Sequence, residues 1–516
     1  MPFRIQDSDP EARARAQIQE SISPDRTAQQ FKCTVAMPRL LHSAEEPLPC
    51  HEPIEETTAI SAHLSARIHT FFQQLAAHDS QTRDASAPAS HGLSIYIEPD
   101  TFEGDPYCYH RKYNSRRLQL QDPETLPDLP FVRSLTVESL PDNGGDWERE
   151  AYKVRPLSLL WPLRCLVHLP RAEELRLPWM WERPMPGSMP SRVVREHYTR
   201  PWEGPLRDAR HEFGAAMADQ EQHLGGRRIP ASLTRAALHF WTPRGVSQED
   251  QAVPRPNLIY PAADDRDPLS LGLRTLASQL HFLDLRALIT KDLFPVPGAP
   301  VEEQWRHMRR MRIEFHPLRP DGRWYFVGPR GEDPNDSADG GFRITEDHYP
   351  RDYDTEEDQE LDEEWEDDPT GGKEGDQFPD MFRTEPCRER IEPLLAAFAR
   401  AVAHGNMPDL QDAELFAYLW WYPGETRAPE YGLEAYDFED KVHRWGVKYV
   451  AGGDTEGQGP VVQWQVGDWR PSPETMSLFE SLGRQEWLDL SFDHTRHLGD
   501  FSVTYGRAVW EPVPTQ

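Results

Sequence analysis

The stretch PLSLLWPLRCLVHLPRAEELRLP, residues 156–178, reads as a short apolar helix, a Leu-Pro break and a brief strand. The apolar positions of that strand are Ala172, Leu175 and Leu177. Alternate side chains of a strand point to the same face, so Leu175 and Leu177 are expected to face the core together. The stretch therefore predicts one unit in which a helix leads into a strand.

The same apolar spacing occurs at five further places along the chain. These are Val132/Leu135/Val137, Leu233/Ala236/Leu238, Leu280/Leu283/Leu285, Met308/Met311/Ile313 and Leu410/Ala413/Leu415. A strand that is fed by a helix and recurs along the chain is the unit of a leucine-rich-repeat-like solenoid. The predicted fold is therefore α/β, an irregular leucine-rich-repeat-like solenoid with a parallel sheet and a helical return layer.

The intervals between these units are unequal, and they divide the chain into six predicted segments. The segments are a disordered N-terminal segment (1–50), an N-terminal helix and strand cap (51–127), solenoid strands one to five (128–330), an acidic disordered insertion (331–386), a last repeat with a β-hairpin and a C-terminal helix cap (387–485), and a C-terminal tail (486–516). The caps are expected because a terminal repeat must cover the apolar face of its neighbour.

Residues 352–368, DYDTEEDQELDEEWEDD, contain 12 acidic residues and no basic one. Self-repulsion and the small number of apolar residues favour a solvated, disordered linker. The alternative is an acidic tract that binds basic proteins such as histones. We expect the linker, because a run of charge alone is weak support for a binding site.

The whole chain has a formal net charge of −31 over 516 residues. Such a charge disfavours binding to nucleic acid or to anionic membranes and makes basic partners more plausible. The N-terminus, MPFRIQDSDPEARARAQ, lacks the apolar core of a signal peptide, and no run approaches the ~20 apolar residues of a membrane helix. A cytoplasmic or nuclear monomer is expected.

The chain lacks the sequence motifs of common active sites. It contains no GxxxxGK[ST], no HExxH and no GxSxG. No catalytic residue, cofactor or metal ligand is therefore predicted, and a protein-interaction scaffold is the first hypothesis for function. A hydrolytic enzyme ranks third, after the acidic-tract binder, because it would need a pocket with convergent polar groups.

Tryptophans and arginines cluster just after several predicted strands. The candidate partner-binding residues are Trp179, Trp181, Arg183, Trp241, Arg244, Trp420 and Trp421. Strand ends lie side by side in a solenoid, so these side chains would form a row along one rim, and Trp and Arg are typical hot spots of protein interfaces. The alternative, to which we give more weight, is that the aromatic side chains pack the return loops against the body.

The residue between the last two apolar positions of each unit should point away from the core. These residues are Thr136, Arg176, Ala237, Asp284, Arg312 and Glu414, followed two positions later by Glu138, Pro178, His239, Arg286, Glu314 and Phe416. If the strands are neighbours, Asp284, Arg312 and Glu414 form a row of alternating charge and Arg286 faces Glu314. This face is expected to be exposed and suited to a polar partner segment, or to act only as a ladder that fixes register.

The order of these pieces resembles a family of poorly characterised fungal proteins described as F-box-like or leucine-rich-repeat-like. The resemblance covers most of residues 54–485 and rests on RPLSLLWPLRCLVHLPRAEELRLP, PWEGPLRDARHEFG, MRRMRIEFHPLRPDGRWYFVGPRGED, DAELFAYLWW, HRWGVKYVAGG and WQVGDWRP. It implies an adaptor that offers its repeats to substrates and docks on a ubiquitin ligase through an N-terminal helical box. Residues 1–50 show no compact Leu-Pro-x-Glu box of that kind.

Overall fold

Six strands of the computed structural model begin with the same backbone turn, which we call the lead-in turn. In each, the N–H of the first apolar position donates to the carbonyl oxygen three residues earlier: Val132 to Leu129 (3.2 Å), Ala172 to Leu169 (2.9 Å), Leu233 to Pro230 (3.0 Å), Leu280 to Ala277 (3.1 Å), Met308 to Trp305 (3.1 Å) and Leu410 to Met407 (3.2 Å). All six first positions are buried. The recurring sequence pattern thus produces a recurring local geometry.

The structure describes residues 5–6, 10–21, 29–40, 49–82, 91–99, 111, 114–138, 154–182, 192–241, 250–261, 265–296, 298, 300, 304–367, 379–403, 405–432, 434, 442–452 and 459–488. Within these residues the central feature is an 11-stranded sheet. From one edge to the other its strands are β15 (Arg484–Trp487), β14 (Val461–Gln465), β13 (Val442–Val450), β12 (Asp412–Trp420), β9 (Arg310–Phe315), β8 (Phe282–Ala287), β7 (Arg235–His239), β6 (Glu174–Leu177), β5 (Val132–Glu138), β4 (His91–Ile97) and β2 (Gln30–Val35).

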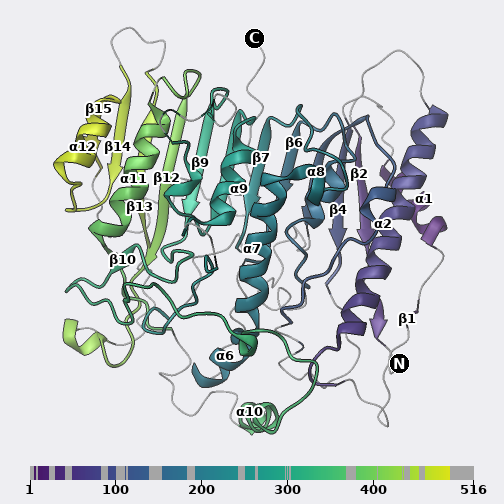
Figure 1. The fold of residues 1–516 in the computed structure, drawn as a ribbon, viewed down its shortest axis with the longest axis horizontal. Coiled ribbons are helices and arrows are strands. Elements are labelled where there is room, and N and C mark those ends of the chain that lie inside the picture. Colours follow the sequence, from purple (N-terminus) through teal and green to yellow (C-terminus); the bar gives the residue numbers. More distant parts are fainter. Residues whose placement is uncertain are drawn as a thin grey trace.

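Most of the sheet is parallel, and its parallel part follows the order of the chain (Figure 1). Every neighbouring pair from β2 through β9 to β12 is parallel. At the C-terminal edge β12, β13 and β14 are antiparallel, and β15 then pairs parallel with β14. The α/β class and the parallel sheet are therefore confirmed, as is the β-hairpin of β13 and β14.

The predicted register of the apolar positions is confirmed. Leu175 pairs with Ala236, Ala236 with Leu283, Leu283 with Met311, and Met311 with Ala413. These side chains are buried in one continuous core. A register shifted by one residue would turn the whole row to the other face, so burial of this row fixes the alignment of the strands.

The helices are α1 (Pro10–Ser21), α2 (Ile54–Thr82), α5 (Trp161–Leu166), α6 (Arg192–Thr199), α7 (Glu203–Ala218), α8 (Gln220–His223), α9 (Pro268–Ala277), α10 (Glu356–Asp367), α11 (Arg388–Val402) and α12 (Pro473–Glu480). Figure 1 shows α7 and α9 next to each other in front of the sheet, with α11 toward one edge and α2 toward the other. Their apolar faces bury Phe71, Phe213, Leu273 and Phe398 in the same core as the strands. The predicted helical layer is thus present over this face of the sheet.

The predicted disorder of residues 1–50 is wrong for the described elements of this segment, above all for one helix and one strand. Helix α1 buries Ala14 and Ile18, and strand β2 buries Phe31, Cys33 and Val35 in strict alternation. Strand β2 pairs parallel with β4, so it, and not the predicted strand near residue 95, forms the N-terminal edge of the sheet. Both apolar patterns are short and lie among polar residues, which hid them in the sequence.

The boundaries at the C-terminal end also change. Helix α12 begins at the predicted Ser472 cap, whose side chain accepts a hydrogen bond from the N–H of Thr475. The chain then adds β15 to the sheet, so the helix is followed by one more strand. Residues 489–516, most of the predicted tail, lie outside the described residues.

The predicted disorder of residues 331–386 is wrong for its described parts. Strand β11 (Glu385–Pro386), at the end of this segment, pairs with β10 (Phe326–Val327), which precedes it. A separate two-stranded sheet is formed at the N-terminus by β1 (Ile5–Gln6) and β3 (Arg39–Leu40). The guanidinium of Arg383 is buried and forms an ion pair with Asp333. The Arg383–Asp333 pair therefore joins the two ends of the insertion, and the pairing of β11 with β10 attaches its C-terminal end to the body.

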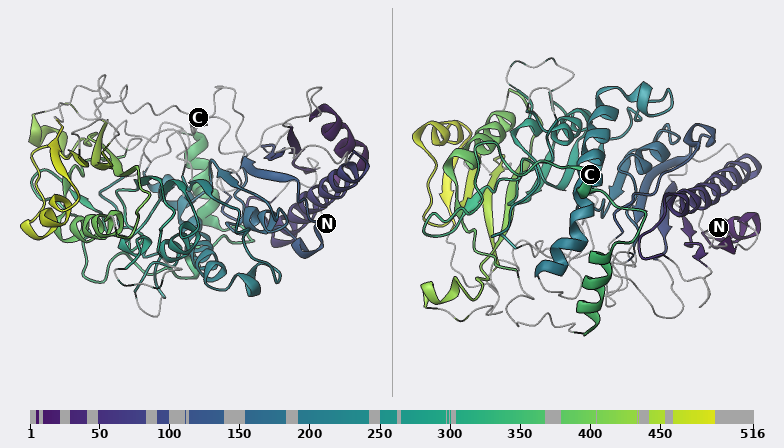
Figure 2. Two further views of the ribbon diagram at one scale, coloured as in Figure 1. Left: turned by 90° about the horizontal axis from the view of Figure 1, so that it is seen from above. Right: turned by 60° about the horizontal axis from the view of Figure 1, so that its bottom comes forward.

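The acidic run itself docks through Asp358 near the start of α10. The carboxylate of Asp358 is buried. It forms ion-pair contacts with Nε2 of His51 at 3.1 Å and with Nε2 of His197 at 2.9 Å. Asp354 accepts a hydrogen bond from the N–H of His51 at 3.0 Å. Helix α10 lies beyond the ends of the strands, below α7 (Figures 1 and 2). The linker interpretation is wrong here because Asp358 is held by contacts with the body. These contacts could not be predicted from the acidic run, since both histidines are far away in the sequence.

We expect Asp358→Asn to release α10 from the body. The change removes the charge that both histidines contact, and a hydrogen bond to a charged group, such as that of His197, contributes about 1.5–3 kcal/mol. Limited proteolysis should then cut residues 350–367 faster than in the wild type. Glu357→Gln, which changes an exposed neighbour on the same helix, should leave the cleavage rate unchanged. Equal cleavage of both variants would show that Asp358 does not hold the helix.

Candidate functional site

The face of the sheet opposite the helices carries a row of polar side chains that crosses almost every strand. Strand register aligns Lys32, Ser94, Thr136, Arg176, Ala237, Asp284, Arg312, Glu414, Lys448 and Gln463. We call this set the polar row. It arises because side chains alternate along each strand while the apolar positions between them face the helices.

Opposite charges meet along the C-terminal half of the polar row. The guanidinium of Arg312 lies 3.9 Å from Asp284 and 3.6 Å from Glu414. Nε2 of His239 lies 3.3 Å from Asp284, and Arg444 forms an ion pair with Glu414. The predicted contact between strands β8, β9 and β12 is therefore confirmed, although the acidic insertion separates β9 from β12 in the chain.

A second pair lies two residues further along the strands. Nε of Arg286 donates to Oε2 of Glu314 at 3.0 Å, as the register predicts. Arg444 extends the network to β14 by donating to Gln465 at 3.1 Å. Across four strands the charged groups thus hold each other in register, a contribution of roughly 0.2–1 kcal/mol per pair.

The prediction that this whole face is exposed is wrong. Four charged residues of this face are buried, namely Asp284, Arg286, Glu314 and Glu414. The three carboxylates are covered by the neighbouring arginine side chains. Burial alone would raise the pKa of Asp284, but His239, Arg312 and Arg286 outweigh it and lower the pKa to about 2. Its contribution to folding is therefore lost only as the pH falls from about 4 toward 2.

The charges that remain accessible on the polar row are basic. Lys32 is exposed, and the side chains of Arg176 and Arg312 are 40% and 36% exposed. Lys448 on β13 is half-buried, whereas the carboxylates of Asp284 and Glu414 are 10% and 9% exposed. Along the polar row itself the cations are therefore more accessible than the carboxylates of Asp284 and Glu414.

The tryptophan rim does not form the exposed surface that it would need to bind a partner. Trp179, Trp181 and Trp241 are buried, and the rings of Trp179 and Trp181 lie 5.0 Å apart. Trp241 packs edge-on against His316 with ring centroids 5.1 Å apart. The packing alternative therefore describes these three residues, whose large apolar rings are mostly buried in folded proteins.

The remaining candidate residues of the rim are half-buried or undescribed. Trp420 and Trp421 are half-buried, and the ring of Trp421 contacts that of Tyr431 at 5.0 Å. Arg183 and Arg244 lie outside the described residues. The structure thus leaves no described cluster of exposed tryptophan and arginine at the strand ends.

Sequence reasoning missed a buried ion network beside α7. We call Arg210, Glu182 and Asp267 the buried triad, because all three side chains are 0% exposed. The guanidinium of Arg210 pairs with Glu182 and donates to both oxygens of Asp267 at 2.8 Å. No pattern of neighbouring residues reveals this network in the sequence. Asp267 also caps α9 by accepting a hydrogen bond from the N–H of Ser270.

Among the described residues, no group of three or more His, Cys, Asp or Glu side chains is arranged to hold a metal ion. No helix within this part of the chain has the length and apolar character needed to cross a membrane.

Comparisons with known proteins return no match. Neither a family model, nor a curated protein, nor a solved structure is similar to the chain. The function of the chain is therefore inferred from the geometry of the fold and of the polar row.

Proposed function

We propose that the chain is an irregular leucine-rich-repeat-like solenoid that acts as a non-enzymatic protein-interaction scaffold. The six lead-in turns support the solenoid, because they repeat one backbone geometry at each strand. The chain-ordered parallel strands support it too, since each repeat of a solenoid contacts its neighbours in sequence.

A second backbone pattern supports the same repeat. At four successive strands, two consecutive N–H groups donate to one carbonyl oxygen of the strand before: Thr234 and Arg235 to Glu173, His281 and Phe282 to Thr234, Arg309 and Arg310 to His281, and Gln411 and Asp412 to Arg309. The intervals between these strands differ in length. Insertions therefore change the return segments while the strand starts keep one geometry, as expected of an irregular solenoid.

The polar row is the surface that we assign to the partner, and the observation that carries this assignment is its accessible charge. Lys32 and Arg312 present cations along the row, and the two carboxylates beside Arg312 are buried. Arg176 adds a third accessible cation, which also contacts the half-buried Glu174 at 2.5 Å. An extended partner segment rich in Asp and Glu complements this pattern. At physiological ionic strength the Debye length is about 8 Å, so nearby cations outweigh the distant negative charge of the chain.

The test uses a fluorescein-labelled polyglutamate peptide and measures its binding by fluorescence anisotropy. The wild type should bind it, and the double variant Arg176→Gln, Lys448→Gln should bind at least about tenfold more weakly, since loss of two charge contacts costs at least 1.4 kcal/mol. Binding should also weaken as salt is raised, because the contacts are electrostatic.

The matched control is Arg228→Gln in the loop that follows α8, where the arginine is 74% exposed and pairs with Glu221. It should bind the peptide as the wild type does. Equal weakening by the control and the double variant would mean that the peptide senses only net charge, and the polar row would lose its assignment.

A ubiquitin-ligase adaptor is the more particular form of this proposal, and it rests on the resemblance to F-box-like proteins alone. Its test is co-purification of the tagged full chain with a ligase core from cells. The acidic-tract binder predicts a different result, in which histones are captured at low salt and shed at high salt.

A further inference from the structure

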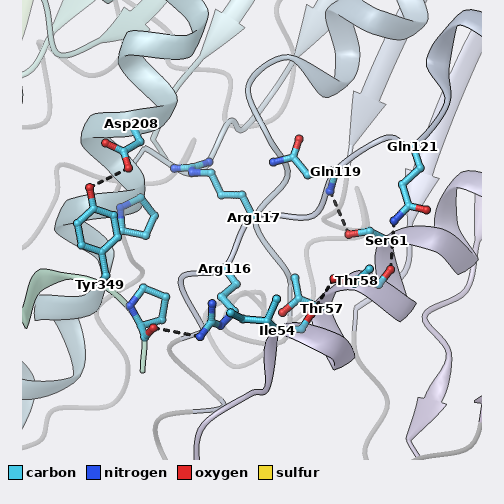
Figure 3. A pocket seen from close by; sticks show the side chains of 12 residues that line it. Ile54, Thr57, Thr58, Ser61, Arg116, Arg117, Gln119, Gln121, Asp208 and Tyr349 are labelled. Atoms are coloured by element: carbon cyan, nitrogen blue, oxygen red, sulfur yellow. Dashed lines mark hydrogen bonds between the residues drawn. The ribbon is translucent and has the colours of Figure 1, made fainter. Parts of the chain in front are cut away.

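A pocket of about 380 Å³ is lined by residues of α2 and α7 and of two loop segments (Figure 3). Its walls are the first turns of α2, residues 116–121, the start of α7 and the Tyr349–Pro350 segment. This volume is within the range of small-molecule pockets. The pocket shares no residue with the polar row, so its role is independent of the proposed scaffold function.

Arg116 enters one side of the pocket and contacts only uncharged acceptors. Its Nε donates to the carbonyl oxygen of Glu52 at 3.2 Å, and its Nη2 donates to those of Pro350 and Arg351 at 3.0 and 3.1 Å. No carboxylate of the described residues forms an ion pair with this guanidinium. Burial lowers the pKa of Arg116, and the carboxylates of Glu52, Asp352 and Glu55, which form no ion pair with it, oppose that shift only in part.

Arg117, the next residue, has the same arrangement deeper in the wall. Its two terminal nitrogens donate to the carbonyl oxygens of Leu157 at 2.9 Å and Trp181 at 2.6 Å. Its Nε is buried and has no hydrogen-bond partner, and within the described part of the chain it too lacks an ion pair with a carboxylate. Burial lowers the pKa of Arg117 to about 10, so the group still carries its charge at neutral pH.

The acidic side chain of the pocket does not neutralise these arginines. Asp208 accepts a hydrogen bond from the hydroxyl of Tyr349 at 2.8 Å and pairs with Arg207 at 2.9 Å (Figure 3). Arg207 therefore cancels Asp208, and the lining retains two positive charges. The rest of the wall is apolar or uncharged, including Ile54, Pro205 and the ring of Tyr349.

We propose that this pocket binds a small organic anion, a carboxylate or phosphate group on a compact apolar body. The oxyanion would take the unused N–H donors of the arginine pair, because a buried guanidinium gains most from an anionic acceptor. The apolar body would lie against Ile54 and the ring of Tyr349. Tyr349 and Pro350 belong to the segment that Asp354 and Asp358 dock, so the acidic insertion supplies one wall of the site.

The experiment titrates the full chain with phenyl phosphate, benzoate and benzyl alcohol by isothermal calorimetry. At least one of the two anions should bind, and benzyl alcohol should bind at least about tenfold more weakly because it lacks the charge. The anion that binds more tightly identifies the head group. Binding of neither anion, or binding of the alcohol as tight as that of both anions, would overturn the proposal.

Substitutions at Arg116 separate its charge from its role in holding the wall. Arg116→Gln should weaken anion binding at least about tenfold, whereas Arg116→Lys should keep it within a few-fold, because the lysine preserves the charge. Arg133→Gln, a change at a partly exposed arginine on β5, serves as the matched control and should bind like the wild type. An equal loss of anion affinity in the Gln and Lys variants would mean that Arg116 only supports the wall of the pocket. The assignment of an anion site would then be wrong.

Discussion

Replacing Arg210 by Met should lower the free energy of unfolding by about 3–5 kcal/mol, because it leaves two buried carboxylates without their counter-charge. Glu182 and Asp267 are both 0% exposed, and Arg210 is the cation that pairs with each of them. Methionine keeps much of the packing volume, so the loss isolates the electrostatic term. Urea unfolding at pH 7, followed by circular dichroism, measures the difference.

The pH dependence of this loss distinguishes a missing counter-charge from poor packing. Buried carboxylates without a cation take up protons more readily, and the neutral form costs less to bury. The deficit of Arg210→Met should therefore shrink as the pH is lowered from 7 to about 5. A deficit that stays constant with pH would point to packing. Adding Glu182→Gln and Asp267→Asn to the variant should recover much of the loss.

The sequence predicted the sheet well because burial of a strand face imposes a period that is visible locally. The pattern Leu175/Leu177, repeated in Leu283/Leu285, was enough to align neighbouring strands, since a slip of one residue would turn every apolar side chain outward. The charge row through Asp284, Arg312 and Glu414 followed from the same alternation. Both results depend only on residues close together within one strand.

The errors arose where distant residues decide the structure. Asp358 is buried because His51 and His197 come to it from separate parts of the chain, and no local pattern in an acidic run announces that contact. For Trp241 the sequence could not decide between an exposed rim and the favoured packing alternative, and the structure packs it in a small cluster with Leu206 and Trp324. The sequence does not reveal the arginine pair of the pocket, Arg116 and Arg117. Whether a carboxylate pairs with either guanidinium can be seen only in the three-dimensional structure.

Leu283→Ala should lower the free energy of unfolding by about 2–5 kcal/mol, the usual sum of lost burial and the remaining cavity. Leu283 lies at the centre of the sheet, pairs with Ala236 on β7 and Met311 on β9, and is 2% exposed. Neither neighbouring strand can move into the space without breaking the register that the charge row also holds. Urea unfolding should show an unchanged slope and a lower midpoint.

The control is Val296→Ala, at a residue 61% exposed, whose free energy of unfolding should stay within about 0.5 kcal/mol of the wild type. An equally small loss at Leu283 would mean that the strand does not face the helix layer, and the apolar spacing that defines each repeat would then have lost its physical basis.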